Sequence, residues 1–263
     1  MVRAVPLLIL FLWLLMAVFG PFLSLNPDQI QLEKILHGPD SQVWLGSDDL
    51  GRPVLDRLIL GAKTSLIVAL WVTIISLLIG TTIGTISGYF GGWLDAMIVR
   101  IIDVFLAVPG ILLAIAFAAV MGPGIENVVI ALSLVGWVGY ARLSRAQVMT
   151  VKHRDHVQAA IALGTPSAAI MRRHLIPLIS APLIVEATFG IAAVVLAEAG
   201  LSFLGLGVQP PDASWGSMVR DGTAYMLVAP HLVVSPGVTI MLVVLSVNIM
   251  GDRLRDKLDI RSR

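Results

Sequence analysis

The chain has 263 residues, of which 57% are hydrophobic and 13% are charged, and its mean hydropathy is +0.91. Because soluble domains carry roughly a quarter charged residues, this composition excludes an ordinary water-soluble globule and indicates a membrane protein. The net charge of +1 predicts no nucleic-acid partner, and the chain has no cysteine for a disulfide or a thiolate-bound metal.

Residues 1–25 contain Arg3 followed by an apolar run. The run is longer than the apolar core of a typical signal peptide, and Ala-Val-Phe at 17–19 is a poor cleavage site. We therefore predict an uncleaved first transmembrane helix, with removal as a signal peptide as the alternative.

Six apolar stretches are long enough to cross a bilayer, and each must be helical because lipid offers no hydrogen-bond partners to the backbone. They lie at residues 4–24, 64–87, 100–122, 126–148, 180–207 and 230–251. The sequence thus predicts an all-α membrane protein with about six transmembrane helices. Pro109 lies inside the third stretch and predicts a kink there.

Composition divides the chain into four parts. We expect a first transmembrane helix (1–25), an extracytoplasmic segment (26–62), a transmembrane core (63–251) that contains a polar loop (149–180), and a tail (252–263).

Basic residues predict the orientation. Residues 142–177 hold six Lys or Arg residues against the single acid Asp155, and the tail after Gly251 holds five more basic residues. The segment 24–63 has six acids against four basic residues. The positive-inside rule places the two basic regions and both termini in the cytoplasm, and the acidic segment outside.

Three glycines, Gly80, Gly84 and Gly88, recur every fourth residue in the second apolar stretch. Small residues at this spacing let membrane helices approach closely, so we expect this face to pack against another helix.

The polar loop 149–180 contains residues that typically start and end two short helices. A helix over 155–162 can be capped by its first residue, an aspartate, and can end at Gly164. Threonine and proline at 165–166 can start a second helix that ends near His174. This helix–turn–helix is either a docking surface for another protein or an amphipathic unit resting on lipid.

The same loop carries a Gln-Ala-Ala triplet, then a glycine, then a His-x-x-Pro motif. The residues are Gln158, Ala159, Ala160, Gly164, His174 and Pro177. This order resembles the EAA loop of permeases of ATP-binding-cassette (ABC) importers, in which a Glu-Ala-Ala triplet precedes the glycine. Four further segments, at 44–52, 88–95, 201–216 and 251–259, look like those of the C-type permease of the dipeptide/oligopeptide/nickel family.

The resemblance implies a type I ABC importer permease fold with a cytoplasmic coupling helix. The residues of the ATPase-coupling loop would be Asp155, Gln158, Ala159, Ala160, Gly164, His174 and Pro177. Gln158 departs from the family pattern, because an amide stands where the family has a carboxylate.

The resemblance also implies an assembly in the bacterial inner membrane. A second homologous permease subunit, two ATPase subunits and an extracytoplasmic substrate-binding protein would be the partners. The ligands would be di- or oligopeptides, with nickel, another small chelate or haem as the alternative. The chain has no Walker A pattern, so we expect a non-catalytic subunit without a cofactor of its own, and ATP and magnesium on the ATPase subunits.

Two polar residues within the apolar stretches are candidates for the translocation path. Glu198 lies deep in the fifth stretch, where a carboxylate normally faces a cavity or a partner, and structural pairing is its alternative role. Asn248 in the sixth stretch is the other candidate, with an interhelical hydrogen bond as the alternative. Glu186 is expected to be structural.

Two other classes of protein fit the sequence less well. A stand-alone secondary transporter would need inverted repeats, and no internal repeat is evident in the sequence. An intramembrane enzyme would need a Ser–His or acid–His pair on facing helices, and histidine is essentially absent from the six stretches.

Overall fold

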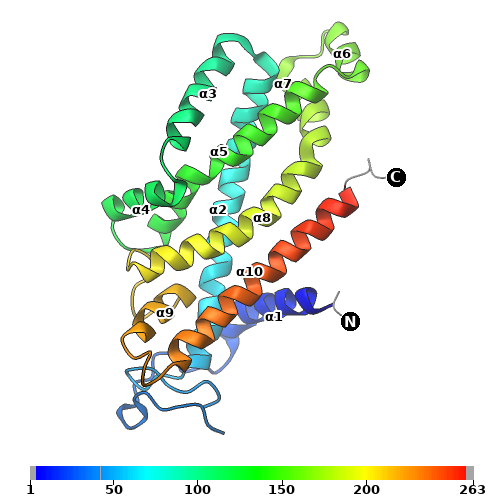
Figure 1. Cartoon of the computed structure of the whole chain (residues 1–263). Coiled ribbons are helices and arrows are strands. Elements are labelled where there is room, and N and C mark those ends of the chain that lie inside the picture. The colour runs from blue at the N-terminus through cyan, green and yellow to red at the C-terminus, as the bar shows by residue number, and fades with distance from the viewer. Residues whose placement is uncertain (1–3, 42, 259–263) are drawn as a thin grey trace.

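The computed structural model describes residues 4–41 and 43–258, which form helices joined by loops (Figure 1). The helices are α1 (Val5–Phe19), α2 (Val54–Phe90), α3 (Gly92–Leu106), α4 (Gly110–Met121), α5 (Ile125–Val151), α6 (Asp155–Ala162), α7 (Ser167–Ile170), α8 (Ile176–Phe203), α9 (Trp215–Thr223) and α10 (His231–Leu258). A π-helical turn, Met171–Leu175, joins α7 to α8, and two short 3-10 turns follow α1. The predicted all-α class is confirmed.

Within the described residues, five helical segments are long and apolar enough to cross a membrane, or six if α3 and α4 form one span. The third apolar stretch was predicted as a single kinked helix over 100–122, and this is wrong. Its two halves, α3 and α4, are separate helices that meet at 82°. Proline explains the break, because Pro109 lacks an N–H donor and disfavours helical backbone in the residue before it.

The helix α2 begins earlier than expected. It starts at Val54, directly after Pro53, so the last part of the predicted extracytoplasmic segment (26–62) is helical. At 37 residues α2 is about 55 Å long. A hydrocarbon core is only about 30 Å thick, so α2 must tilt or extend beyond the bilayer.

The helices α2 and α5 pack along one another, and α2 also contacts α1 and α8. The glycine ladder forms this seam, as predicted. A Cβ atom added at Gly84 would lie 2.2 Å from the carbonyl oxygen of Ala141, and one added at Gly80 would lie 2.4 Å from that of Trp137. The two backbones approach so closely because these positions carry no side chain.

Two tryptophans hold α1 and α9 against α2. The indole nitrogen of Trp13 donates to the carbonyl of Ala62 (3.1 Å), and that of Trp215 donates to the carbonyl of Leu58 (2.9 Å). The two rings are buried with their centroids 6.1 Å apart. This contact secures the N-terminal helix to the bundle.

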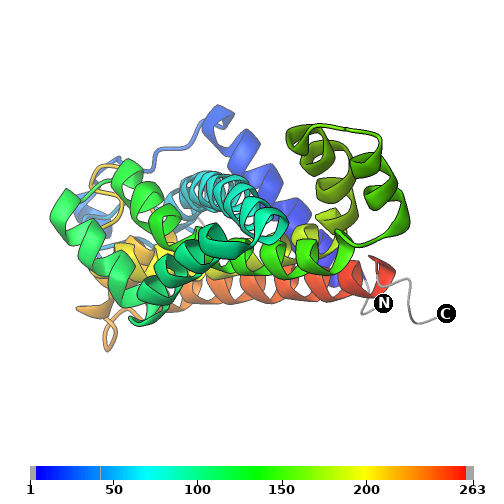
Figure 2. The ribbon, with the colours of Figure 1, turned by 90° about the horizontal axis from the view of Figure 1, so that it is seen from above.

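The molecule has two distinct ends. Figures 1 and 2 both show α6, the first turns of α1 and the last turns of α10 toward one side, on the right. The helix α9 and the loops between α1 and α2 lie toward the opposite side. The basic loop and the acidic segment of the sequence are therefore at opposite ends of the bundle.

Candidate functional site

The helix α6 has the predicted bounds, Asp155–Ala162, and the predicted glycine end. Gly164 has a φ of +80°, and its N–H donates to the carbonyl of Ile161 (2.9 Å). The N–H of Thr165 donates to the carbonyl of Ala160 (3.1 Å). This pair of bonds is the Schellman motif, in which a residue with positive φ ends a helix.

The start of α6 and the helix that follows differ from expectation. Asp155 is the first helical residue rather than the cap, and the next helix starts at Ser167 after Pro166. This second helix was predicted to end near His174, and that is wrong, because it continues through the π-helical turn into α8. In a π turn each hydrogen bond spans one more residue than in an α-helix. This turn lets the helix continue past Pro177, which has no N–H to donate a hydrogen bond.

Contacts within the chain hold α6 in place from its inner side. The side chain of Val157 is fully buried and belongs to the same apolar cluster as Ile170 and Leu175. Gln158 Nε2 donates to the carbonyl of Lys152 (2.8 Å), and Lys152 Nζ donates to the carbonyl of Gly88 (2.8 Å) at the end of α2. The amide of Gln158 therefore bonds to the end of α5.

Several apolar residues on the outer side of α6 and at its C-terminal end are uncovered. The exposed apolar residues are Ala159, Ile161, Ala162 and Leu163, of which Leu163 is 86% exposed, and the polar residues Asp155, His156 and Gln158 are exposed beside them. Nearby, the rings of His156 and His174 lie 6.4 Å apart. The loop thus presents a small apolar surface away from the helix bundle.

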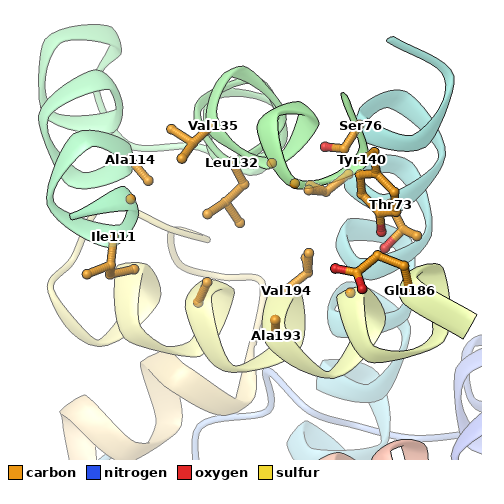
Figure 3. Close-up of a pocket in the computed structure, with 16 residues that line it drawn as sticks. Thr73, Ser76, Ile111, Ala114, Leu132, Val135, Tyr140, Glu186, Ala193 and Val194 are labelled. Atoms are coloured by element: carbon orange, nitrogen blue, oxygen red, sulfur yellow. The ribbon is translucent and has the colours of Figure 1, made fainter. Parts of the chain in front are cut away.

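A cavity of about 290 Å³ lies between α2, α4, α5 and α8 (Figure 3). Most of its lining is apolar or glycine: Val72, Gly110, Ile111, Ala114, Leu132, Val135, Gly136, Gly139, Gly190, Ala193, Val194 and Ala197. Four polar side chains complete it: Thr73, Ser76, Tyr140 and Glu186.

The polar side chains gather at one end of this cavity. Figure 3 shows the Tyr140 and Thr73 hydroxyls at the same end of the cavity as Glu186, whose carboxylate extends from there into the cavity. The hydroxyls of Thr73, Ser76 and Tyr140 are buried and have no hydrogen-bond partner among the described residues. Gly190 makes room for this end, because a Cβ atom there would lie 2.3 Å from the Tyr140 hydroxyl.

Glu186 also lines a second cavity of about 530 Å³. The other lining residues come from α5, α8 and α10: Leu143, Gln147, Ala181, Pro182, Val185, Phe189, Arg255 and Leu258. Glu186 therefore lines both cavities and is exposed rather than buried, and the second cavity extends toward the C-terminal end of α10.

Glu198 occupies a packed site instead. Its side chain is 1% exposed, and it accepts hydrogen bonds from the hydroxyls of Ser202 (2.7 Å) and Ser65 (3.3 Å). Neither Glu198 nor Asn248 lines the two cavities above, so the roles predicted for them in a path remain predictions. Glu186 was expected to be structural rather than part of a path, although the glycines at 136, 139 and 190 were a signal of open space around it.

Residues 80–263 match the family described as "Binding-protein-dependent transport system inner membrane component". The chain belongs to this family. It is a transport permease subunit, and the predicted family is confirmed. Membership in this family explains why the chain has several helices apolar enough to cross a membrane, because the family consists of inner membrane components.

Curated relatives of this permease cover most of its length. It is 41% identical to the dipeptide transport system permease protein DppC of Alkalihalophilus pseudofirmus, over 97% of this chain and 84% of that protein. It is 41% identical to the di/tripeptide transport system permease protein DppC of Pseudomonas aeruginosa, over 96% of this chain and 86% of that protein. It is 40% identical to the glutathione transport system permease protein GsiD of Pectobacterium atrosepticum, over 86% of this chain and 75% of that protein.

The fold of the permease is similar to that of a chain in the inward-facing MetNI methionine ABC transporter. The TM-score is 0.64 at 19% sequence identity, and the match covers 78% of this chain and 98% of that chain. The predicted ABC importer permease fold is thus confirmed.

Proposed function

We propose that this permease forms, with a second permease subunit, the membrane path of an ATP-driven importer of di- or oligopeptides. The observation that carries this proposal is the identity of about 40% over nearly the whole chain to permeases named for dipeptide, di/tripeptide and glutathione transport. Two ATPase subunits would bind ATP and magnesium, and an extracytoplasmic binding protein would deliver the peptide.

The docking surface for the ATPase would be the outer side of α6. Its apolar residues are exposed. Exposed apolar patches on a protein normally contact another protein or a membrane. The buried contacts of Val157 and the bond from Gln158 to the end of α5 give such a docked helix a firm connection to the bundle. A force on α6 would then reach α2 and α5.

The orientation follows from the charge distribution and the two ends of the molecule. The basic loop around α6 and the ends of α1 and α10 would lie in the cytoplasm, and the acidic loops beside α9 would face the binding protein.

Reconstitution tests the proposed function. The permease, its partner permease and the ATPase subunits are placed in proteoliposomes with the binding protein and a labelled dipeptide. We expect peptide uptake that requires ATP hydrolysis and the binding protein. Uptake of the same peptide without ATP would contradict the proposal and favour a stand-alone transporter.

A pair of matched variants tests the docking surface. Leu163→Glu places a charge on the outer side of α6, and Leu227→Glu makes the same change at a fully exposed leucine between α9 and α10. We expect Leu163→Glu to reduce the amount of ATPase that co-purifies by about tenfold, since a buried unpaired charge costs well over 1.4 kcal/mol. Leu227→Glu should leave it unchanged, and equal losses in both variants would contradict docking through α6.

A further inference from the structure

We propose that Glu186, Tyr140 and Thr73 form a binding subsite for an alkylammonium group in the open cavity between α2, α4, α5 and α8. In the transported ligand this group would be the free amino terminus of the peptide, an assignment that rests on the function proposed above. Neither family membership nor the names of the relatives assign a role to these three residues.

The subsite offers only oxygen atoms to a ligand. The Tyr140 and Thr73 hydroxyls and the Glu186 carboxylate come from three different helices and line the same end of the cavity (Figure 3). An ammonium group has three N–H donors and no acceptor, and it would meet one acceptor on each helix. A carboxylate ligand would find one carboxylate and no cation at this end, so the charge selects against it.

The polar groups of the subsite also lack partners of their own. Glu186 takes part in no hydrogen bond or ion pair among the described residues. The hydroxyls of Tyr140 and Thr73 are buried without a partner there as well. A carboxylate within a membrane helix is costly unless it faces a cavity or a partner, and unsatisfied buried hydroxyls are costly too. A bound ammonium group would satisfy all three residues.

The two cavities around Glu186 give the rest of the ligand a place. The first holds about 290 Å³, close to the lower limit of pockets for small ligands, and its walls beyond the polar end are apolar. It can therefore take a short peptide or one end of a longer one. The second cavity contains Arg255, a cation that could pair with the ligand's carboxylate on the side of the α10 C-terminus.

A single cysteine can report on the charge of this subsite. The chain contains no cysteine, and a Cβ atom at Gly139 would lie 4.0 Å from Glu186 Oε1 with no nearer contact. Gly139→Cys thus places one thiol beside the carboxylate without a clash. The assembled complex is treated with cationic 2-aminoethyl or anionic 2-sulfonatoethyl methanethiosulfonate, and the mass of the permease subunit is followed over time.

We expect the cationic reagent to be favoured, and the ratio of the two rates to fall about tenfold when Glu186→Gln removes the charge. The ratio cancels any change in the reactivity of the thiol itself. Glu126→Gln, at an exposed position in the first turn of α5, is the control and should leave the ratio unchanged. A ratio that Glu186→Gln does not alter would overturn the proposal.

Protection from labelling identifies the ligand chemistry. A dipeptide with a free amino terminus should slow the labelling of Gly139→Cys at least severalfold more than its N-acetylated form or an equal concentration of sodium or potassium chloride. Tyr140→Phe should weaken this protection but leave the ratio of the two labelling rates unchanged. This variant tests the subsite if the Glu186→Gln complex does not assemble. Equal protection by both forms of the dipeptide, or by the salts, would contradict an alkylammonium subsite.

The outcomes separate this inference from the proposed function. If the complex imports no peptide but the Glu186-dependent ratio and the protection by free amines are found, the peptide assignment fails and the alkylammonium subsite stands. If peptide import is found and the ratio does not depend on Glu186, the subsite fails and the proposed function stands.

Discussion

Two carboxylates of α8, twelve residues apart, have different surroundings. Glu198 is buried and accepts two serine hydroxyls, whereas Glu186 lines two cavities and has no hydrogen bond among the described residues. Residues twelve apart point roughly 120° from one another on a helix, so the two belong to different faces. The chemistry of the side chain alone therefore does not decide its role.

Substitutions of Glu198 distinguish a structural role from one in the path. Glu198→Gln keeps an oxygen acceptor for the serines, and we expect a thermal midpoint and peptide uptake close to those of the unmodified complex. Glu198→Ala leaves both serine hydroxyls buried without this partner, at about 1–3 kcal/mol each. We expect a lower thermal midpoint in detergent for Glu198→Ala. An assembled Glu198→Gln complex without uptake would instead support the path role.

The end of α6 depends on the backbone of one glycine. Gly164 has a φ of +80°, and a Cβ atom added there would meet no other atom within 4 Å. Gly200 in α8 has equally open space with ordinary helical backbone. Gly164→Ala should destabilise the end of α6 by about 1–2 kcal/mol, because an L side chain disfavours this conformation. Gly200→Ala should not destabilise its helix.

Limited trypsin digestion measures this difference. The basic residues Arg154 and Arg172 lie on either side of α6 and provide cleavage sites. We expect cleavage in Gly164→Ala to be about 5–30-fold faster than in the unmodified chain, since cleavage follows the population of the opened loop. Cleavage as fast in Gly200→Ala would show that the positive φ is not the cause.

At the scale of the elements, the seam between α2 and α5 and the break between α3 and α4 shape the bundle. Regular spacing of glycines predicted the seam, because it is a property of one helix face. The break follows from Pro109, but its angle of 82° does not follow from the sequence. A proline permits a range of bends, and the helices packed around it select one.

The glycine seam can be tested with one methyl group. Gly84→Ala places a Cβ atom 2.2 Å from a carbonyl oxygen of α5, so the helices must separate. Overpacking of this kind costs about 1–3 kcal/mol. We expect a lower thermal midpoint for the purified complex, measured by the loss of its monodisperse peak in size-exclusion chromatography after heating. Gly237→Ala, in α10 with no neighbour within 4 Å, is the matched control and should keep the midpoint.

The whole molecule places basic and acidic segments at opposite ends, and this predicts its orientation in the membrane. Because the chain has no cysteine, any labelling of it by a thiol reagent comes from the introduced cysteine. Trp44→Cys lies in the acidic segment and Asp256→Cys lies near the end of α10, and both positions are exposed. We expect an impermeant thiol reagent to label Trp44→Cys in intact cells, and Asp256→Cys only after the membrane is opened. The reverse pattern would invert the proposed orientation.

The sequence by itself determined the membrane class, the number of apolar stretches, the glycine seam and the bounds of α6. Each of these depends on composition or on residues close together in the chain, such as the Ala162-to-Gly164 ending of α6. The family resemblance rested on ordered local motifs for the same reason.

Only the tertiary structure decided where the open space lies and which polar groups meet there. Glu186, Tyr140 and Thr73 are on three helices, and nothing in their spacing along the chain brings them together. The continuity of α7, the π turn and α8 was likewise hidden, because Pro177 ends a helix in most contexts and continues one here. Which helix faces meet depends on packing between residues far apart in sequence, so the cavity and its carboxylate could not be predicted from local patterns.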